Sequence, residues 1–138
     1  MMISACTLVV FGFTVDQVLQ ANTPTRRELD LVELWSGCGS LVTAARNQKL
    51  QAASFDKLNH DTQDFTTLSG FQAALHLVMQ LKQGALLWEG VDCSSFTFAD
   101  SSRCRRSKEL REGNTSYHKA RDANLMAHIA CFFMVVCV

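Results

Sequence analysis

The sequence of 138 residues has only one proline and seven glycines, too few for a collagen-like or proline-rich chain. It also lacks an excess of charge, since 13 basic and 13 acidic side chains give a formal net charge of 0. Hydrophobic residues make up 48% of the chain, which excludes a disordered tail, because disorder requires low hydrophobicity and high net charge. The length fits a single domain that buries about two-thirds of its unfolded surface.

Metal-ligand motifs are absent as well. The chain has no Cys-x-x-Cys pair and no zinc-type spacing of cysteine and histidine; its six cysteines are Cys6, Cys38, Cys93, Cys104, Cys131 and Cys137. We therefore predict no metal site. The chain is too large and too apolar to depend on disulfides, so we expect reduced thiols and a cytoplasmic or nuclear protein.

Neither end of the chain carries a clear targeting or membrane signal. Residues 1–13 are apolar like the core of a signal peptide, but no lysine or arginine precedes Arg26, so a signal peptide is the less favoured interpretation. Residues 129–138 form a run of ten apolar residues, about half of a membrane span. We predict a buried helix there and no membrane association.

Charge is divided unevenly along the chain. Residues 1–100 carry six basic and ten acidic side chains, whereas residues 101–138 carry seven basic and three acidic ones. Five of the basic residues fall within nine positions: Arg103, Arg105, Arg106, Lys108 and Arg111. Arginine forks suit phosphate groups, so this segment predicts contact with nucleic acid, although an ordinary solvated loop can have the same composition.

Apolar patterns typical of strands alternate with patterns typical of helices from residue 29 onward. Strands are predicted at residues 29–35, 52–55, 63–66 and 85–91. Helices are predicted at residues 41–50, from an N-cap at Ser69 through Leu81 with a stop at Gly84, and from about residue 119 to the end. The alternation indicates an α/β fold, a partial Rossmann-like three-layer sandwich with a mostly parallel sheet of about four strands and flanking helices. Residues 1–28 form a separate, poorly defined segment and linker.

Three segments rich in glycine or polar residues directly follow predicted strands: residues 36–40, Asp56 and residues 92–96. Ligands bind beyond the carboxyl ends of parallel strands, so these segments together predict one ligand site. Gly37 and Gly39 allow a tight turn there, but the third glycine of a dinucleotide-binding loop is missing, and the acidic Glu33 also disfavours NAD and FAD. Asp56 ends the next strand, where a carboxylate can accept both hydroxyls of a ribose.

Residues 33–40, with the sequence Glu-Leu-Trp-Ser-Gly-Cys-Gly-Ser, resemble motif I of class I S-adenosylmethionine (SAM) dependent methyltransferases. They are most similar to the motif of DNA cytosine-5 methyltransferases. The resemblance implies that the glycines pass close to the methionine part of SAM, that the tryptophan lines the cofactor pocket and that Asp56 holds the ribose. The implied cofactor-binding residues are Glu33, Trp35, Ser36, Gly37, Gly39 and Asp56. The alternative is a glycine turn in an unrelated α/β protein, with Asp56 as a loop carboxylate.

A second segment, residues 90–96, resembles the Gly-x-Pro-Cys-Gln-x-Phe motif of the same family. In that family the cysteine thiolate adds to a flipped-out cytosine, so the resemblance implies that Cys93 is a catalytic nucleophile. Here Asp92 stands in place of the proline and Ser94 in place of the glutamine. A neighbouring carboxylate disfavours a thiolate, and the alternative is a small, buried cysteine at the end of a strand.

The resemblance covers residues 29–138 and implies the first four strands of a methyltransferase sheet, in the order 3-2-1-4. The glutamate that protonates the base in that family belongs to a later motif, so we expect residues 29–138 to be a truncated, diverged and incomplete domain. The fourth strand would then be an exposed edge that residues 1–20 or a second chain could cover.

Two functional hypotheses follow from the sequence. The first is a SAM-dependent methyltransferase-like domain that acts on or binds nucleic acid, with its enzymatic activity left open. The second is a non-catalytic module that binds nucleic acid or protein through the basic loop of residues 103–111.

Overall fold

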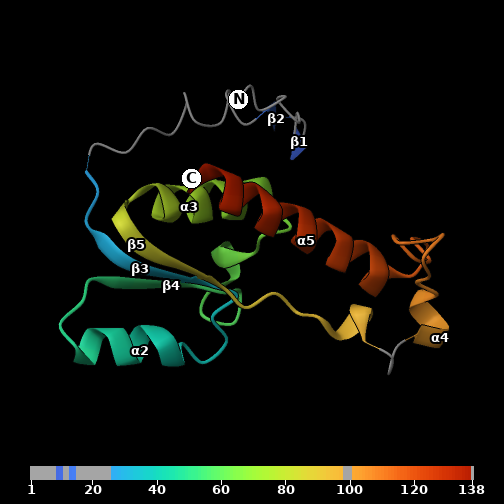
Figure 1. Ribbon diagram of the computed structural model, residues 1–138, viewed down its shortest axis with the longest axis horizontal. Helices are drawn as coiled ribbons and strands as arrows, with labels where there is room; N and C mark the ends of the chain where they lie inside the picture. Colours follow the sequence, from blue (N-terminus) through green and yellow to red (C-terminus); the bar gives the residue numbers. More distant parts are fainter. Residues whose placement is uncertain (1–8, 11–12, 15–25, 98–100, 138) are drawn as a thin grey trace.

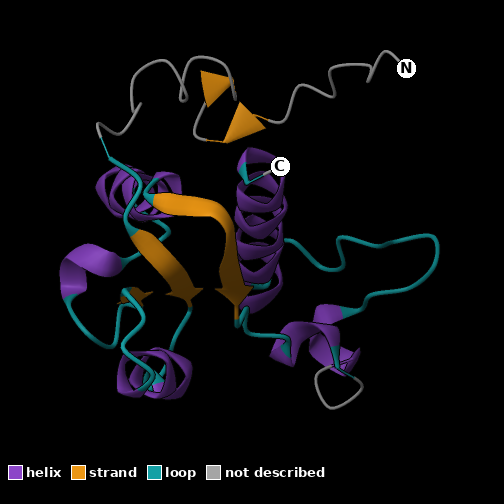
Figure 2. Ribbon diagram, turned by 60° about the vertical axis from the view of Figure 1, so that its left-hand side comes forward, coloured by secondary structure: helices purple, strands orange, loops and turns teal. Residues whose placement is uncertain are grey.

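Three parallel strands form the central sheet of the computed structural model, which describes residues 9–10, 13–14, 26–97 and 101–137. The strands are β3 (Leu29–Leu34), β4 (Ala52–Phe55) and β5 (Leu81–Glu89), and their order is β4-β3-β5. Leu31 of β3 lies opposite Ala52 on one side and Leu86 on the other. The sheet is open, with β4 and β5 as its two edges (Figure 2).

Helices cover both faces of the sheet, which confirms the predicted α/β class and its three layers (Figure 1). Helix α2 (Ser40–Asn47) packs against β3 and β4, and its buried residues Val42 and Ala45 meet Leu31 and Ala52. On the opposite face lie α3 (Leu68–Met79) and α5 (His118–Val136). Connections that cross from one parallel strand to the next must pass over a face of the sheet, and α2 and α3 are these crossovers.

Aromatic side chains dominate the larger core, which lies between the sheet and the pair α3 and α5. Its largest fully buried members are Phe55, Phe71, Phe132, Phe133, Leu34, Leu75, Ile129 and Val32. The rings of Phe71 and Phe133 stack with their centroids 5.6 Å apart. Burial of each such side chain contributes about 1.5–3 kcal/mol, so this core is the main stabilising element of the fold.

The predicted strand at residues 63–66 is wrong. Those residues belong to the 3-10 helix η1 (Asp61–Gln63) and the turns that follow it, so the described residues form a parallel sheet of three strands. The Asp64 carboxylate accepts hydrogen bonds from the backbone N–H and the hydroxyl of Thr66, at 2.8 and 2.6 Å. Such local side-chain bonds compete with a sheet ladder, and the predicted order is confirmed only for the remaining three strands.

The boundary between α3 and β5 also differs from the prediction. Thr67, not Ser69, caps α3, because its side chain accepts the N–H of Gly70 at 3.0 Å. Leu81 is the first residue of β5 instead of the last of the helix. Gly84 lies inside β5 with φ +76°, next to an irregularity in the register with β3, so it bends a strand and does not end a helix.

Short elements complete the described chain. They are an antiparallel pair of β1 (Val9–Val10) and β2 (Phe13–Thr14), the 3-10 helix η2 (Ser94–Phe96) and α4 (Ser101–Cys104). Apart from these two short strands, residues 1–25 lie outside the described residues, and with them most of the apolar stretch considered as a signal peptide. No helix within the described ranges is long and apolar enough to cross a membrane, and the apolar end of α5 packs into the core.

Candidate functional site

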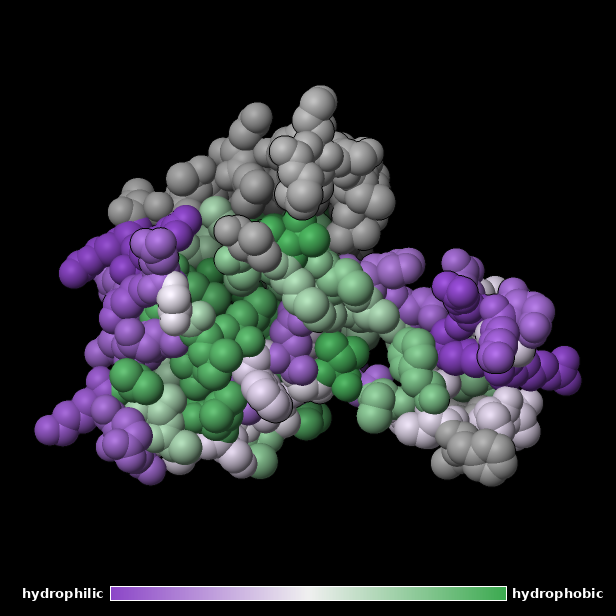
Figure 3. Space-filling view, in the orientation of Figure 1, coloured by the Kyte–Doolittle hydropathy of each residue, from purple (hydrophilic) through white to green (hydrophobic). Residues whose placement is uncertain are grey.

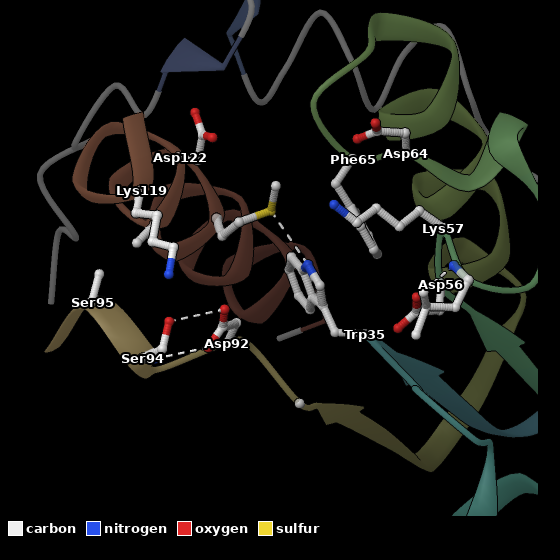
Figure 4. Close-up of a pocket in the computed structure, with 14 residues that line it drawn as sticks. Trp35, Asp56, Lys57, Asp64, Phe65, Asp92, Ser94, Ser95, Lys119 and Asp122 are labelled. Carbon is white, nitrogen blue, oxygen red and sulfur yellow. Dashed lines mark hydrogen bonds between the residues drawn. The ribbon is translucent and has the colours of Figure 1, made fainter. Parts of the chain in front are cut away.

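A cleft of about 430 Å³ opens at the carboxyl ends of the three parallel strands (Figure 4). Each strand end contributes to its lining, and α5 closes the remaining side. The principal lining residues are Trp35 after β3, Asp56, Lys57 and Leu58 after β4, Asp92 and Ser94 after β5, and Lys119, Asp122 and Met126 of α5. The segments that the sequence places after its strands therefore do meet at one edge of the sheet.

Trp35 stands at the centre of the cleft and has unusual backbone geometry. Its φ of 53° lies in the left-handed region, which costs a residue with a Cβ about 1–2 kcal/mol. The ring contacts hold it there: the indole stacks on Phe65 with centroids 4.2 Å apart, and its Nε1–H points to the sulfur of Met126 at 3.3 Å. Strain of this kind is often found at ligand sites, where surrounding contacts maintain it.

The Asp56 carboxylate connects the loop after β3 and the loop after β4 by hydrogen bonds at the mouth of the cleft. It is buried, and its Oδ2 accepts the N–H of Gly37 at 2.9 Å while its Oδ1 accepts the N–H of Leu58 at 2.8 Å. The glycine turn after β3 is thereby tied to the end of β4. Each carboxylate oxygen has a further lone pair, so both oxygens can also accept a hydrogen bond from a ligand.

The other residues of the glycine turn do not line the cleft. Gly37 and Gly39 have φ values of 52° and 65°, and a Cβ at either position would have no neighbouring atom within 4 Å, so backbone conformation and not crowding favours glycine there. Ser36 is buried beneath the turn, where its carbonyl accepts the N–H of Gly39 at 2.8 Å. These residues shape the turn beside the cleft.

Glu33 faces away from the cleft, toward the start of α2. It is buried, and its Oε2 accepts the N–H of Val42 at 2.9 Å. The first N–H groups of a helix have no partner within the helix, and a carboxylate near them is also favoured by the helix dipole. The structure thus gives Glu33 a role in joining β3 to α2.

The cleft is lined by more acidic than basic side chains. Its charged residues are Asp56, Asp64, Asp92, Asp122, Lys57 and Lys119. Hydrogen bonds from the hydroxyl and the N–H of Thr66 hold the pKa of Asp64 below its usual value, so that carboxylate is ionised at neutral pH. At the rim, Leu58 is 77% exposed and offers an apolar surface next to Asp56.

Cys93 is exposed and is not among the residues that line the cleft, although its neighbours are. The Asp92 carboxylate turns toward Ser94, whose N–H and hydroxyl it accepts at 2.8 and 3.1 Å. The alternative of a buried structural cysteine is therefore wrong. No group of three or more potential metal ligands occurs within the described ranges.

The side chains of the basic segment differ in their exposure to solvent. Arg103, Arg105, Lys108 and Arg111 are exposed, and Arg103 belongs to α4. Arg106 is half-buried, and its guanidinium donates hydrogen bonds to the carbonyls of Ser95, Arg111 and Ala120 and to the Ser95 hydroxyl. It also lies 3.9 Å from the centroid of the Phe96 ring. This geometry favours a structural role for Arg106.

Comparison with protein-family models, curated proteins and solved structures finds no match to this chain. Function must therefore be inferred from the cleft itself. The sequence points to Trp35 and Asp56 but misses Phe65, Lys119 and Met126, which also line it. Met126 and Trp35 are 91 positions apart in the sequence, and local sequence patterns cannot predict a contact between residues so far apart.

One carboxylate outside the cleft predicts a pH dependence of stability. Burial raises the pKa of Glu89, the last residue of β5, to about 7, and its Oε1 has no hydrogen-bond partner among the described residues. The unfolded chain loses this proton near the ordinary pKa of about 4.3. The native state binds more protons between these values, so stability falls as the pH rises from about 4 to 7.

We expect Glu89→Gln to remove this loss of stability at neutral pH, because glutamine has no proton to lose. The shift corresponds to about 4 kcal/mol at most, and solvent screening of a half-buried side chain reduces it to about 1–2 kcal/mol. Thermal unfolding should give equal Tm values for the two proteins at pH 4 and a variant Tm higher by about 3–6 °C at pH 8. The exposed Glu112→Gln is the control, and an equal gain at both pH values would contradict the prediction.

Proposed function

We propose that this domain binds S-adenosylmethionine in the cleft at the carboxyl edge of the sheet, as a methyltransferase-like domain. The observation that supports this most is convergence: Trp35, Asp56 and the segment around Asp92 follow three different strands and line one cleft. Open parallel sheets bind their ligands at this edge. The volume of about 430 Å³ lies within the range of small-molecule sites.

The charge of the cleft supports a cationic ligand. SAM carries a sulfonium and an ammonium group against one carboxylate, and the lining has more carboxylates than lysines. The face of the Trp35 indole adds a surface that attracts a cation. The same acidic excess opposes the phosphates of ATP or NAD, which makes these nucleotides the natural negative controls.

The nucleoside part of the ligand has two matching surfaces at the rim. Asp56 retains a free lone pair on each carboxylate oxygen, which suits the paired hydroxyls of a ribose. Leu58, two residues further along, gives an apolar contact for the face of a base. Together they favour an adenosyl ligand over a simple amine.

Nucleic acid is the substrate class that we propose for this domain. The exposed Arg105, Lys108 and Arg111 precede α5 in the chain and lie outside the acidic lining of the cleft. Figure 1 shows that α4 and the following loop lie at the N-terminal end of α5, the end that carries Lys119. A phosphate backbone held by these side chains would lie beside the proposed cofactor cleft.

Calorimetry of the purified chain with SAM tests the proposal directly. We expect binding by the native chain, loss of at least tenfold in affinity for Asp56→Ala, and no detectable binding of ATP. Asp56 also ties two loops together, so Leu58→Ser is a second variant that leaves the core intact, and it should lose affinity several-fold. Asp61→Ala, exposed and outside the cleft, is the matched control. Absence of SAM binding at millimolar concentration would refute the proposal.

A further inference from the structure

Phe96 exposes an aromatic ring between the cleft and the basic segment of residues 103–111. The side chain is 49% exposed, and it follows Ser94 and Ser95, which both line the cleft. The basic segment contains no aromatic residue of its own, but η2, which ends at Phe96, lies against α4, where this segment begins. Exposed aromatic rings beside cations are the common feature of surfaces that bind single-stranded nucleic acid.

Arg106 covers one face of this ring and is itself held in place. Its guanidinium carbon lies 3.9 Å from the ring centroid, and its Nε donates to the carbonyl of Ser95, the residue before Phe96, at 3.2 Å. A second nitrogen donates to the carbonyl of Ala120 on α5 at 3.3 Å, so two elements fix the guanidinium. Among the described residues no other ring lies against Phe96, which leaves its opposite face for a planar group.

Positive charge gathers next to the ring. Arg105, Lys108 and Arg111 are exposed, and none of them forms an ion pair within the part of the chain that the structure describes. Figure 3 shows hydrophilic side chains gathered at the end of the molecule where Figure 1 places α4 and the loop before α5. The one carboxylate of residues 103–111, Glu109, accepts the hydroxyl of Ser107 at 2.9 Å. The segment therefore keeps a net positive charge for the phosphates of a nucleic acid.

We propose that Phe96 stacks on an unpaired base of a single-stranded nucleic acid whose phosphates contact the exposed cations of the basic segment. This inference rests on the nucleic-acid substrate proposed above and names its form. In a duplex the bases are stacked on one another, whereas a single strand offers each base face to a protein ring. Because the preceding residue, Ser95, lines the cleft, the nucleotide next to the stacked base lies at the cleft.

Fluorescence anisotropy of labelled oligonucleotides tests this contact on the full chain. We expect Phe96→Leu, which keeps an apolar side chain beneath Arg106, to lower the affinity for a single strand of about twelve nucleotides, DNA or RNA, by about tenfold. The salt slope should not change, because no charge is removed. Phe96→Tyr should retain the native affinity. Trp88→Leu, which removes an aromatic ring that is 53% exposed on β5, is the matched control and should bind like the native chain.

A strand of the same length in which abasic sites replace the bases isolates the stacking contact, because it keeps every phosphate. The native chain should bind this strand about tenfold more weakly than the intact strand, and Phe96→Leu should weaken the binding no further. The corresponding duplex should be bound equally by the native chain and by Phe96→Leu. The abasic comparison uses the native protein, so it decides the proposal even where Phe96→Leu lowers the Tm.

Each outcome decides the proposal. A loss that is confined to the intact single strand, and that neither Phe96→Tyr nor Trp88→Leu shares, supports it. Oligonucleotide binding that Phe96→Leu leaves unchanged overturns this proposal alone, as does equal native affinity for intact and abasic strands or an equal loss of duplex affinity. A native chain that binds no oligonucleotide overturns both this proposal and the nucleic-acid substrate, whereas calorimetry decides SAM binding separately.

Discussion

Gly70→Ala should destabilise the domain by about 3 kcal/mol or more, the largest effect we expect from a single methyl group. A Cβ at this position would lie 2.0 Å from the carbonyl oxygen of Asp64 and 2.6 Å from its carbonyl carbon. Both are backbone atoms, so no side chain can rotate away to relieve the clash. The first turn of α3 and the turn at residues 64–67 would have to separate.

That separation should also reach the cleft. Phe65 lies in the turn at residues 64–67 that the added methyl group would displace. It is 3% exposed, and its ring stacks on the ring of Trp35. Urea unfolding followed by tryptophan fluorescence measures the loss of stability, and SAM calorimetry measures the damage to the cleft. Ala73→Gly on the exposed side of the same helix is the control and should cost only about 1 kcal/mol. A Gly70→Ala protein as stable as that control would contradict the packing described here.

Arg106→Ala should produce the second large loss, about 3 kcal/mol. The guanidinium holds three carbonyls and one hydroxyl at 2.7–3.3 Å and covers the Phe96 ring, and hydrogen bonds from a charged donor contribute more than neutral ones. Lysine cannot reproduce this fork, so Arg106→Lys should recover little of the stability. Thermal unfolding, with hydrogen exchange of residues 94–113, measures the effect. Lys108→Ala, exposed in the same segment, should be neutral.

This role changes how nucleic-acid binding has to be tested. Loss of DNA binding in an Arg106 variant would report a loosened loop instead of a lost phosphate contact. Alanine at Arg105, Lys108 and Arg111 together should leave the Tm unchanged. If the segment contacts phosphates, this triple variant should also lower the salt slope of duplex DNA binding by about 2–3. An unchanged slope would exclude these side chains from the interface.

The parts of the fold that follow local patterns could be predicted from the sequence. Residues 29–35 and 52–55 have the apolar patterns of strands, and a segment with the apolar spacing of a helix separates them. These patterns predict two of the strands, the helix between them and their parallel arrangement. The stretch at 63–66 has strand-like composition, but Asp64 and Thr66 bond to each other and close a turn. Leu81 continues the apolar face of α3, and only its contacts in the sheet show that the helix has already ended.

The candidate site was predictable to the extent that it lies at strand ends. Trp35 and Asp56 line the cleft as expected, because the carboxyl ends of parallel strands share one edge of the sheet. The contribution of α5 to the cleft was not predictable from the sequence, because the position of α5 depends on the aromatic core around Phe65 and Phe133. Arg106 shows a further limit: composition identifies a basic cluster but not which of its members is bonded within the fold.

The contacts of Arg106 also join the basic segment mechanically to two walls of the cleft. The Arg106 guanidinium donates hydrogen bonds to the carbonyls of Ser95 and Ala120. Ser95 lines the cleft beside Ser94, and Ala120 directly follows Lys119, another lining residue. We therefore expect a partner that binds residues 105–111 to act on the walls of the cleft through these hydrogen bonds. By thermodynamic reciprocity, we expect a ligand of the cleft and a partner of the basic segment to change each other's affinity by the same factor, with Arg106 as the residue that connects the two surfaces.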